Sequence, residues 1–172
     1  MLMHLKYLKS LLRHKLLVYQ EGRTLGLSVW RCLIHDWQKF TPAEWFPYVR
    51  AFYGPKPVNN RKPEGDDAFD LAWLHHQKFG PHHWQFWIMH EDSGKVYCLP
   101  MPDTYRREML ADWRGANRAY GDISLADWYR RNRDTRMLHP ETQKWIEQQL
   151  GLWECPRCGM DQDPYMCDFL GG

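Results

Sequence analysis

The sequence predicts an all-α fold: a mainly helical bundle with one small β-hairpin and a short cysteine-containing C-terminal tail. Three observations support this prediction. Apolar residues recur at helical spacing along most of the chain. Gly and Pro stand at the ends of the periodic stretches, where helices stop. A further stretch, FWIMHEDSGKVYCLP, has the pattern of two short strands that turn at Asp92-Ser93-Gly94.

The N-terminal part of the chain predicts two helices. The first is expected over 3–20, because one face carries residues at helical spacing: Tyr7, Leu11, His14 and Val18. The second is expected over 26–38, after the glycines at 22 and 26. It ends in LIHDWQKF, where a His and an Asp close an apolar run. Either a surface helix end or a metal site explains such a pair.

Start and stop signals mark the remaining helices. Thr41-Pro42-Ala43-Glu44 has the pattern of a capping box with Pro at the first helical position, so we expect a third helix that stops at Gly54-Pro55. A loop over 54–67 is expected to follow. Later helices are expected over 67–79, 103–119, 124–132 and 140–149.

Composition restricts the class of protein. A chain of 172 residues can bury a sizeable core, and 15% aromatic residues argue against disorder. The net charge of +2 is too small for a dedicated nucleic-acid binder. No apolar stretch approaches the roughly 18 residues of a membrane span, and the N-terminus lacks a signal-peptide pattern. We expect a cytoplasmic protein without nucleic-acid or membrane partners, with one domain over 1–150 and the tail over 151–172.

Side chains that bind metal ions recur in order on separate predicted helical segments. They are a single His, a His-Asp pair, a cluster of His and a final Asp: His14, His35, Asp36, His75, His76, His82, His83 and Asp112. Neutral imidazole suits several first-row metals, and a carboxylate can bridge two ions. The pattern predicts one or two divalent or iron-group ions (Mn, Fe, Co, Ni or Zn). It leaves open which of the clustered His are ligands.

This order of residues resembles the HD-domain superfamily of metal-dependent phosphohydrolases. The resemblance rests on His14, on HDWQK at 35–39, on the downstream His cluster and on Asp112, and it covers roughly residues 10–140. HHQKFGPHHW and EMLADWRGA also resemble an uncharacterised family of bacteria and their phages, which implies no particular activity. The superfamily resemblance implies an HD-domain-like helical bundle that hydrolyses a phosphate ester, with a nucleotide as the expected substrate.

In the hydrolase that this resemblance implies, metal-activated water attacks phosphorus. Asp36 and Lys39 are the candidate catalytic residues. Asp36 would bridge the ions and position the water, and Lys39 would place a point charge beside a phosphoryl oxygen. Arg114 and Arg118 are further candidates for binding the substrate's phosphate. The alternative for these arginines is a solvated, ion-paired face, because Asp and Glu are interspersed with them.

Two other functions fit the same residues. One is a di-iron oxygenase of the HD type, because members of the superfamily that cleave C–C or C–P bonds with dioxygen are rich in His. The other is a non-catalytic binding module stabilised by its metal, although every expected ligand position is filled. Iron content, colour and oxygen consumption separate the oxygenase from the hydrolase.

The C-terminal tail differs in composition from the rest of the chain. Cys155-Pro-Arg-Cys158-Gly is typical of half a zinc knuckle, and Cys167 follows it. A structural zinc site takes four ligands, so the fourth would be an Asp of the tail, a distant His or a residue of a partner chain. The alternative is a flexible tail with reduced thiols. The three cysteines also suggest a homodimer.

Overall fold

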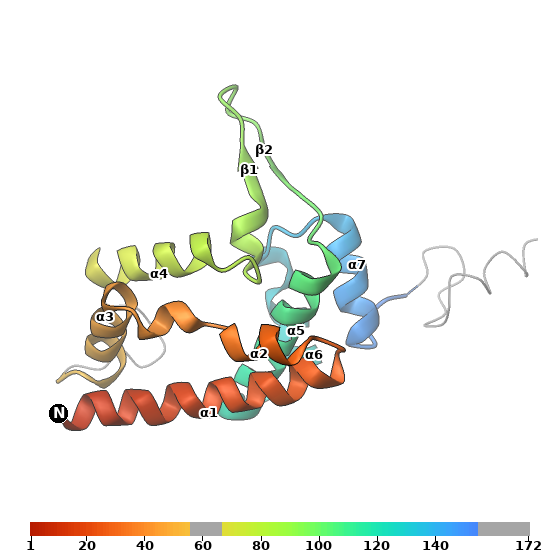
Figure 1. Ribbon diagram of the computed structural model, residues 1–172. Helices are drawn as coiled ribbons and strands as arrows, with labels where there is room; N and C mark the ends of the chain where they lie inside the picture. The colour runs from red at the N-terminus through yellow and green to blue at the C-terminus, as the bar shows by residue number, and fades with distance from the viewer. Residues whose placement is uncertain (56–66, 155–172) are drawn as a thin grey trace, which may run out of the picture.

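Helices make up most of the computed structural model, which describes residues 1–55 and 67–154 (Figure 1). The α-helices of these residues are α1 (Leu2–Thr24), α2 (Val29–Ile34), α3 (Pro42–Tyr53), α4 (Asp67–Phe79), α5 (Asp103–Tyr120), α6 (Leu125–Asn132) and α7 (Pro140–Gln149). Short 3-10 helices cover Trp37–Phe40, Trp84–Trp87 and Arg133–Thr135. The prediction of a mainly helical fold with one small hairpin is confirmed. None of the described helices has the length and apolar composition needed to cross a membrane.

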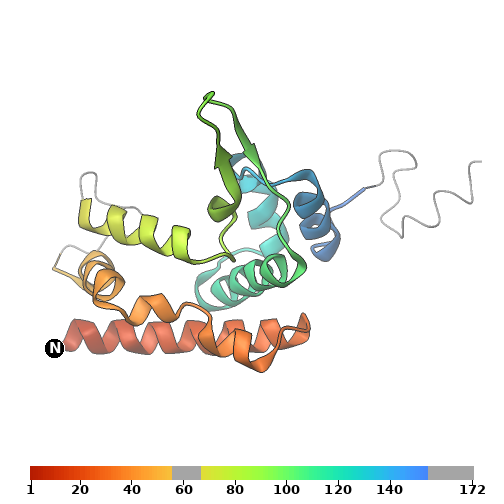
Figure 2. The ribbon, with the colours of Figure 1, turned by 45° about the horizontal axis from the view of Figure 1, so that its top comes forward.

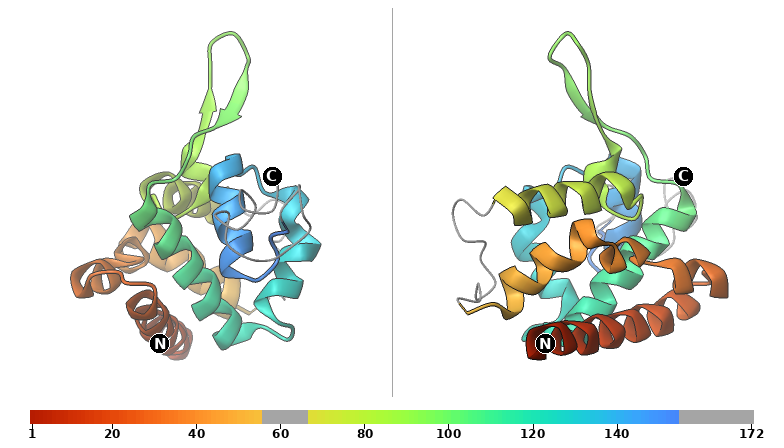
Figure 3. Two further views of the ribbon diagram at one scale, coloured as in Figure 1. Left: turned by 90° about the vertical axis from the view of Figure 1, so that its right-hand side faces the viewer. Right: turned by 60° about the vertical axis from the view of Figure 1, so that its left-hand side comes forward.

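The long helices α1 and α5 pack directly against each other (Figure 2; Figure 3). Gly115 permits this approach, because a Cβ at that position would lie 2.7 Å from Val18 Cγ2 and 2.9 Å from Val18 N. His14 lies about one turn before Val18 on α1, and Asp112 lies about one turn before Gly115 on α5. The close contact therefore brings an imidazole and a carboxylate from distant parts of the sequence next to each other.

The predicted second helix is interrupted in the structure. Helix α2 begins after Ser28, whose hydroxyl accepts a hydrogen bond from Arg31 N, and it ends at Ile34. Asp36 then adopts a left-handed backbone conformation with φ of 56°. The prediction of one helix over 26–38 is wrong, because a residue with positive φ does not fit inside a right-handed helix.

Helix α3 begins at Pro42 as expected, but the predicted capping box does not form. The Thr41 hydroxyl donates to Gln38 O at 2.7 Å, and the helix N-terminus receives no side-chain hydrogen bond. Glu44 is fully buried and turns its carboxylate toward α4. The prediction is wrong because two imidazoles of α4 lie within reach of this carboxylate and take the place of the backbone N–H groups.

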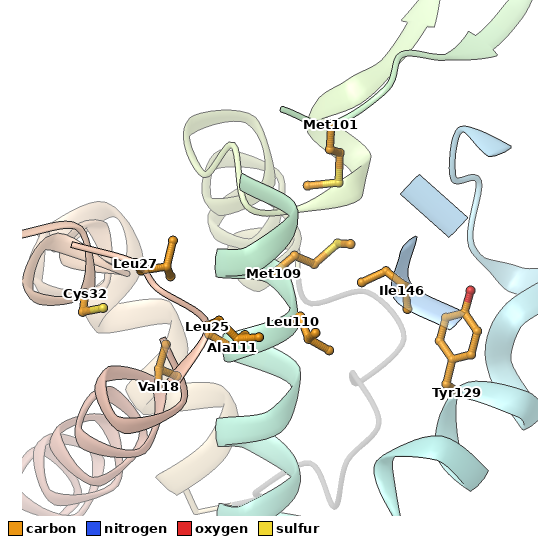
Figure 4. Close-up of a cluster of buried hydrophobic side chains, with 10 residues drawn as sticks. All are labelled: Val18, Leu25, Leu27, Cys32, Met101, Met109, Leu110, Ala111, Tyr129 and Ile146. Atoms are coloured by element: carbon orange, nitrogen blue, oxygen red, sulfur yellow. The ribbon is translucent and has the colours of Figure 1, made fainter. Parts of the chain in front are cut away.

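Among the described residues, two clusters of buried apolar side chains hold the helices together. The first joins the C-terminal half of α1 to α2, α5, α6 and α7 (Figure 4), and comprises Val18, Leu25, Leu27, Cys32, Met101, Met109, Leu110, Ala111, Tyr129 and Ile146. The second joins the N-terminal half of α1 to α3 and α4, and comprises Tyr7, Leu11, Tyr48, Val49 and Ala72. His14 lies on α1 between the residues that enter the two clusters. The junction of the clusters is therefore a polar site within an apolar framework.

The hairpin projects from the helical body in every view (Figure 3). Strand β1 (Ile88–His90) pairs antiparallel with β2 (Val96–Cys98), and Met89 lies opposite Tyr97. Gly94 has φ of 84°, which the turn between the strands requires. The predicted hairpin and its turn are confirmed.

Candidate metal centre

Among the described residues, three groups of side chains could hold a metal ion, and one of them, formed by His35, His82 and Glu108, overlaps the other two. Those other two groups share Asp36 and meet at the junction of the two clusters. We call the first the carboxylate-rich group; it consists of His14, His35, Asp36 and Asp112. We call the second the histidine-rich group; it consists of Asp36, His76, His82 and His83. Within each group, one ligand atom per residue lies within 4.8 Å of the others. The structure thus brings together all but one of the His and Asp residues that the sequence order singled out.

The carboxylate-rich group is assembled from α1, the end of α2 and α5. His14 Nε2 lies 3.1 Å from Asp112 Oδ1 and 3.5 Å from Asp36 Oδ2. His35 Nε2 lies 3.5 Å from Asp36 Oδ2 and 3.6 Å from Asp112 Oδ1. His14, His35 and Asp36 are all buried. The left-handed backbone at Asp36 lets two neighbouring side chains reach the same point.

The histidine-rich group comes from the end of α4 and the turn that follows it. His76 Nε2 lies 3.4 Å and His82 Nε2 lies 3.2 Å from Asp36 Oδ1. The His83 ring packs against both imidazoles, with centroid distances of 4.6 and 4.2 Å. Gly80 makes this turn possible, because a Cβ there would lie 2.9 Å from both His76 O and His83 Cδ2.

Asp36 divides its two carboxylate oxygens between the groups. Oδ2 faces His14 and His35, whereas Oδ1 faces His76 and His82. A carboxylate in this position can bridge two ions. The Nε2 atoms of five imidazoles are buried and make no hydrogen bond within the described residues: His14, His35, His76, His82 and His83. Unpaired imidazole nitrogens around a shared carboxylate form a donor set that fits one or two first-row metal ions.

Two buried glutamates hold the opposite nitrogens of these imidazoles. Glu108 Oε1 lies 3.0 Å from His35 Nδ1 and 3.5 Å from His82 Nδ1. Glu44 Oε2 lies 3.0 Å from His76 Nδ1. At His35 the hydrogen bond with Glu108 fixes the tautomer and the ring orientation, so that Nε2 is left free to bind a metal. Glu44 lies beside His76 Nδ1 without a hydrogen bond to it within the described residues, so its negative charge acts on this ring through proximity.

Sequence reasoning did not identify either glutamate as part of the site. The local sequence places Glu44 in a helix cap and does not reveal its burial. Glu108 precedes Asp112 by four positions on α5, so both lie on the same helical face, and this spacing is a signal that points to it. Its other oxygen, Oε2, lies 2.5 Å from Arg31 Nε, which balances one buried negative charge.

Without a metal ion, the carboxylate-rich group holds a proton on His35. Burial lowers the pKa of His35, but the carboxylates of Asp36, Asp112 and Glu108 outweigh burial and raise this pKa to about 10. Burial raises the pKa of the Asp36 carboxyl, but His35 and Lys39 hold it well below its usual value. The group is therefore a buried ion-pair network at neutral pH.

The imidazoles of the histidine-rich group behave differently. Burial lowers the pKa of His76, in spite of the opposing charge of Asp36. Burial also holds the pKa of His83 well below its usual value, and His82 and His76 lower it further. These two rings are neutral at physiological pH, which is the form that binds a metal ion.

Lys39 supplies a positive charge beside the shared carboxylate. Its Nζ donates to Asp36 Oδ2 at 2.5 Å. Burial lowers the pKa of the Lys39 ammonium, but Asp36 and Asp112 outweigh this and raise it, so the side chain stays charged. Lys39 belongs to the 3-10 turn Trp37–Phe40, which follows directly from the left-handed residue.

A cavity of about 700 Å³ opens onto the centre. Both groups contribute to its lining, the carboxylate-rich group through His14 and Asp112 and the histidine-rich group through His76 and His83, and Lys39 also lines it. This volume lies in the range of small-molecule sites. The candidate metal centre is therefore placed where a ligand can reach it.

Several predicted site residues lie elsewhere. His75 Nδ1 lies 2.7 Å from Glu44 Oε1, and the His75 imidazole belongs to neither group. Arg118 pairs with Glu21 at 2.8 Å, and neither Arg114 nor Arg118 is among the described residues that line the cavity. The predicted zinc ligands of the tail, Cys155, Cys158 and Cys167, lie outside the described residues. Most of the predicted loop over 54–67 lies outside them as well.

The chain belongs to a family of unknown function, DUF5662, whose family model matches residues 3–152. No curated protein and no solved structure shows significant similarity to the chain. The matched range contains every residue of both groups. Membership of this family assigns no chemistry, so the function has to be argued from the site itself.

Proposed function

We propose that this member of the DUF5662 family is a phosphohydrolase, and that it hydrolyses a phosphate ester, with a nucleotide as the class of substrate, at a centre of two divalent metal ions. The observation that carries the proposal is the division of the Asp36 oxygens between two groups of ligands. Two ions about 3.5–4 Å apart, when bound, activate water and stabilise the attacking and leaving oxygens of a phosphoryl transfer.

The residues of the chain have separable tasks in this reaction. Asp36 holds the two ligand groups at a fixed separation, and its backbone conformation orients it toward both. Glu44 and Glu108 orient the imidazoles from behind. Lys39 lines the cavity beside Asp36, where its ammonium can meet a phosphoryl oxygen whose charge grows in the transition state.

The order of the ligands along the chain supports the proposal by analogy. A His, a His-Asp pair, further His and a final Asp follow one another as in the HD-domain phosphohydrolases that the sequence resembles. This analogy concerns residue types and their order, and it adds to the geometric argument without replacing it.

The test is phosphate release by protein loaded with Mn²⁺, Co²⁺, Ni²⁺ or Zn²⁺, measured on a panel of nucleotides and simple phosphomonoesters. We expect release from at least one ester by the wild-type chain and a loss of at least about a thousandfold in Asp36→Asn. His90→Ala, on the projecting hairpin, is the matched control and should retain full activity. Two bound ions per chain without release of phosphate from any ester would overturn the proposal.

A di-iron oxygenase is the second candidate, and the histidine-rich group favours it. That group offers three imidazoles and one carboxylate, a set that suits iron as well as zinc or nickel. The oxygenase predicts two irons per chain after aerobic or anaerobic loading with Fe²⁺, together with substrate-dependent oxygen uptake. Phosphate release with redox-inert Zn²⁺ favours the hydrolase instead.

A further inference from the structure

The walls of the cavity are aromatic. Beyond the metal-binding residues and Lys39, its lining includes six aromatic side chains: Tyr7, Tyr48, Phe52, Tyr53, Trp73 and Tyr120. Phe52 and Trp73 remain 40% and 37% exposed, so part of each ring is accessible to a ligand. Aromatic rings gain energy from flat partners through stacking as well as from burial. The body of a ligand that fits this cavity is therefore flat and apolar or aromatic.

The cavity offers charge for a single anionic group. Lys39 is the one Lys or Arg among the described residues that line it, and Lys39 is already paired with Asp36. Together with the Lys39 ammonium, two divalent ions would exceed the charge of the two ligating carboxylates by three, which favours a dianionic head such as that of one phosphate monoester. A second charged group on the ligand would face aromatic walls, where burying an unpaired charge is costly.

Two phenol hydroxyls on these walls lack partners. Tyr7 and Tyr48 are each 5% exposed, and neither Oη makes a hydrogen bond within the described residues. Their rings lie 6.3 Å apart, and the Lys39 ammonium lies 6.0 Å from the Tyr48 ring centroid. Buried polar groups are nearly always satisfied, so two unpaired hydroxyls in one cavity need a partner. A phosphate oxygen accepts such hydrogen bonds.

We propose that the cavity selects phosphate monoesters that carry one dianionic head on a flat, uncharged ring body, and that the hydroxyls of Tyr7 and Tyr48 donate hydrogen bonds to the head. This inference rests on the proposed function for the location of the head at the metal centre.

Phosphonates test the inference, because their C–P bond is not hydrolysed by a phosphoesterase and binding is measured apart from turnover. On protein loaded with Zn²⁺, calorimetry should show that benzylphosphonate binds about tenfold or more tightly than butylphosphonate. A second phosphonomethyl head on the same ring, in 1,4-xylylenediphosphonate, should weaken binding by a similar factor. Equal affinity for the benzyl and butyl compounds, or for one head and two, would refute the selectivity.

Single substitutions separate the residues that recognise the phosphonate head from those that recognise the ring. Tyr7→Phe and Tyr48→Phe keep the rings and should weaken benzylphosphonate and butylphosphonate by the same factor, about three- to tenfold. Phe52→Leu should instead reduce the preference for the benzyl compound. Tyr97→Phe, on the hairpin, is the matched control and should bind both compounds as the wild type does.

Urea unfolding excludes a purely structural explanation for the phenols. Because an unpaired buried hydroxyl costs stability, neither Tyr→Phe variant should be less stable than the wild type. Unchanged phosphonate affinity in both variants would refute the role of the hydroxyls. Selective phosphonate binding without hydrolysis of any phosphate ester would overturn the proposed function and leave the inferred selectivity standing. Hydrolysis of a phosphate ester without selective phosphonate binding would overturn the selectivity and leave the proposed function standing.

Discussion

The two halves of the candidate centre share Asp36 but are built differently. The carboxylate-rich group depends on three helical segments that are far apart in sequence, and it holds a proton on His35 at neutral pH. The histidine-rich group comes mainly from one helix end and the turn after it, and its His76 and His83 rings are neutral. The first group therefore depends on tertiary packing and on pH, whereas the second depends mostly on a local turn.

Removing the shared ligand gives the largest expected effect. Asp36→Asn should lose both ions, because the amide has no negative charge to offer either group. His14→Ala and His83→Ala should each lose one ion, since each residue belongs to a single group. Elemental analysis after loading with Zn²⁺ and gel filtration measures the number of ions per chain.

The control for this comparison is His90→Ala, which should retain both ions because it lies on the hairpin. One ion retained by Asp36→Asn would show that the groups do not share this carboxylate. Both ions lost by His14→Ala would show that the groups do not fill independently.

Substituting a glutamate behind the imidazoles should have the next largest effect on zinc binding. The loss of affinity should be confined to one of the two groups. Glu44→Gln removes the negative charge behind His76 and should weaken zinc binding at the histidine-rich group by about 10- to 100-fold. The carboxylate-rich group should keep its affinity, because Glu44 contacts none of its imidazoles in the described structure. Titration with Zn²⁺ against a competing chelator resolves the two affinities. Equal weakening of both would contradict a local role for Glu44.

The sequence singles out most of the candidate metal-binding residues that the structure brings together, but it does not predict the details of their arrangement. Helical periodicity placed His14 and Asp112 on apolar faces, and the structure brings them within 3.1 Å of each other. Periodicity did not separate His75 from His76, because neighbouring helical positions differ by about 100° and both flank the apolar face. Both rings lie against Glu44 in the structure, but only the fully buried His76 also reaches Asp36.

The other features of the site that the sequence does not predict share one physical cause. Glu44 reads as a helix cap in the local sequence, and its burial becomes visible only when α3 and α4 are packed together. The left-handed conformation of Asp36 is also set by its surroundings, since most residues other than Gly avoid it. Buried polar networks of this kind follow from tertiary contacts, which local patterns do not contain.

Substituting Ala for Gly115 or for Gly80 tests how the carboxylate-rich group and the histidine-rich group each depend on close packing. Gly115→Ala should force α1 and α5 apart and lower the free energy of unfolding by about 1–3 kcal/mol, with weaker zinc binding at the carboxylate-rich group. Gly80→Ala should disturb the turn before His82 and weaken the histidine-rich group instead. Urea unfolding and zinc titration measure both effects. The same pattern of zinc loss in both variants would contradict the separate construction of the groups.

Proton release on metal binding is the smallest expected effect, and it distinguishes the groups directly. The pKa of His35 is raised to about 10, above the value of 6.5 for a free imidazole, so its proton is bound at pH 7.5 and an ion must displace it. The ion pairs of this protonated His35 stabilise the metal-free fold fully below pH 6.5, and this contribution is lost as the pH rises toward about 10.

Calorimetry in two buffers of different ionisation enthalpy counts the protons released at pH 7.5. Filling the carboxylate-rich group should release at least one proton, because burial lowers the pKa of His14 but Asp112 and Asp36 outweigh burial and raise this pKa as well. The affinity of this group for zinc should therefore fall at least about tenfold for each unit of decreasing pH. His76 and His83 have no such proton to lose, so the histidine-rich group should fill first and with a smaller dependence on pH. If the first ion bound released as many protons as the second, the electrostatic difference between the two groups would not exist, and their contrast would rest on packing alone.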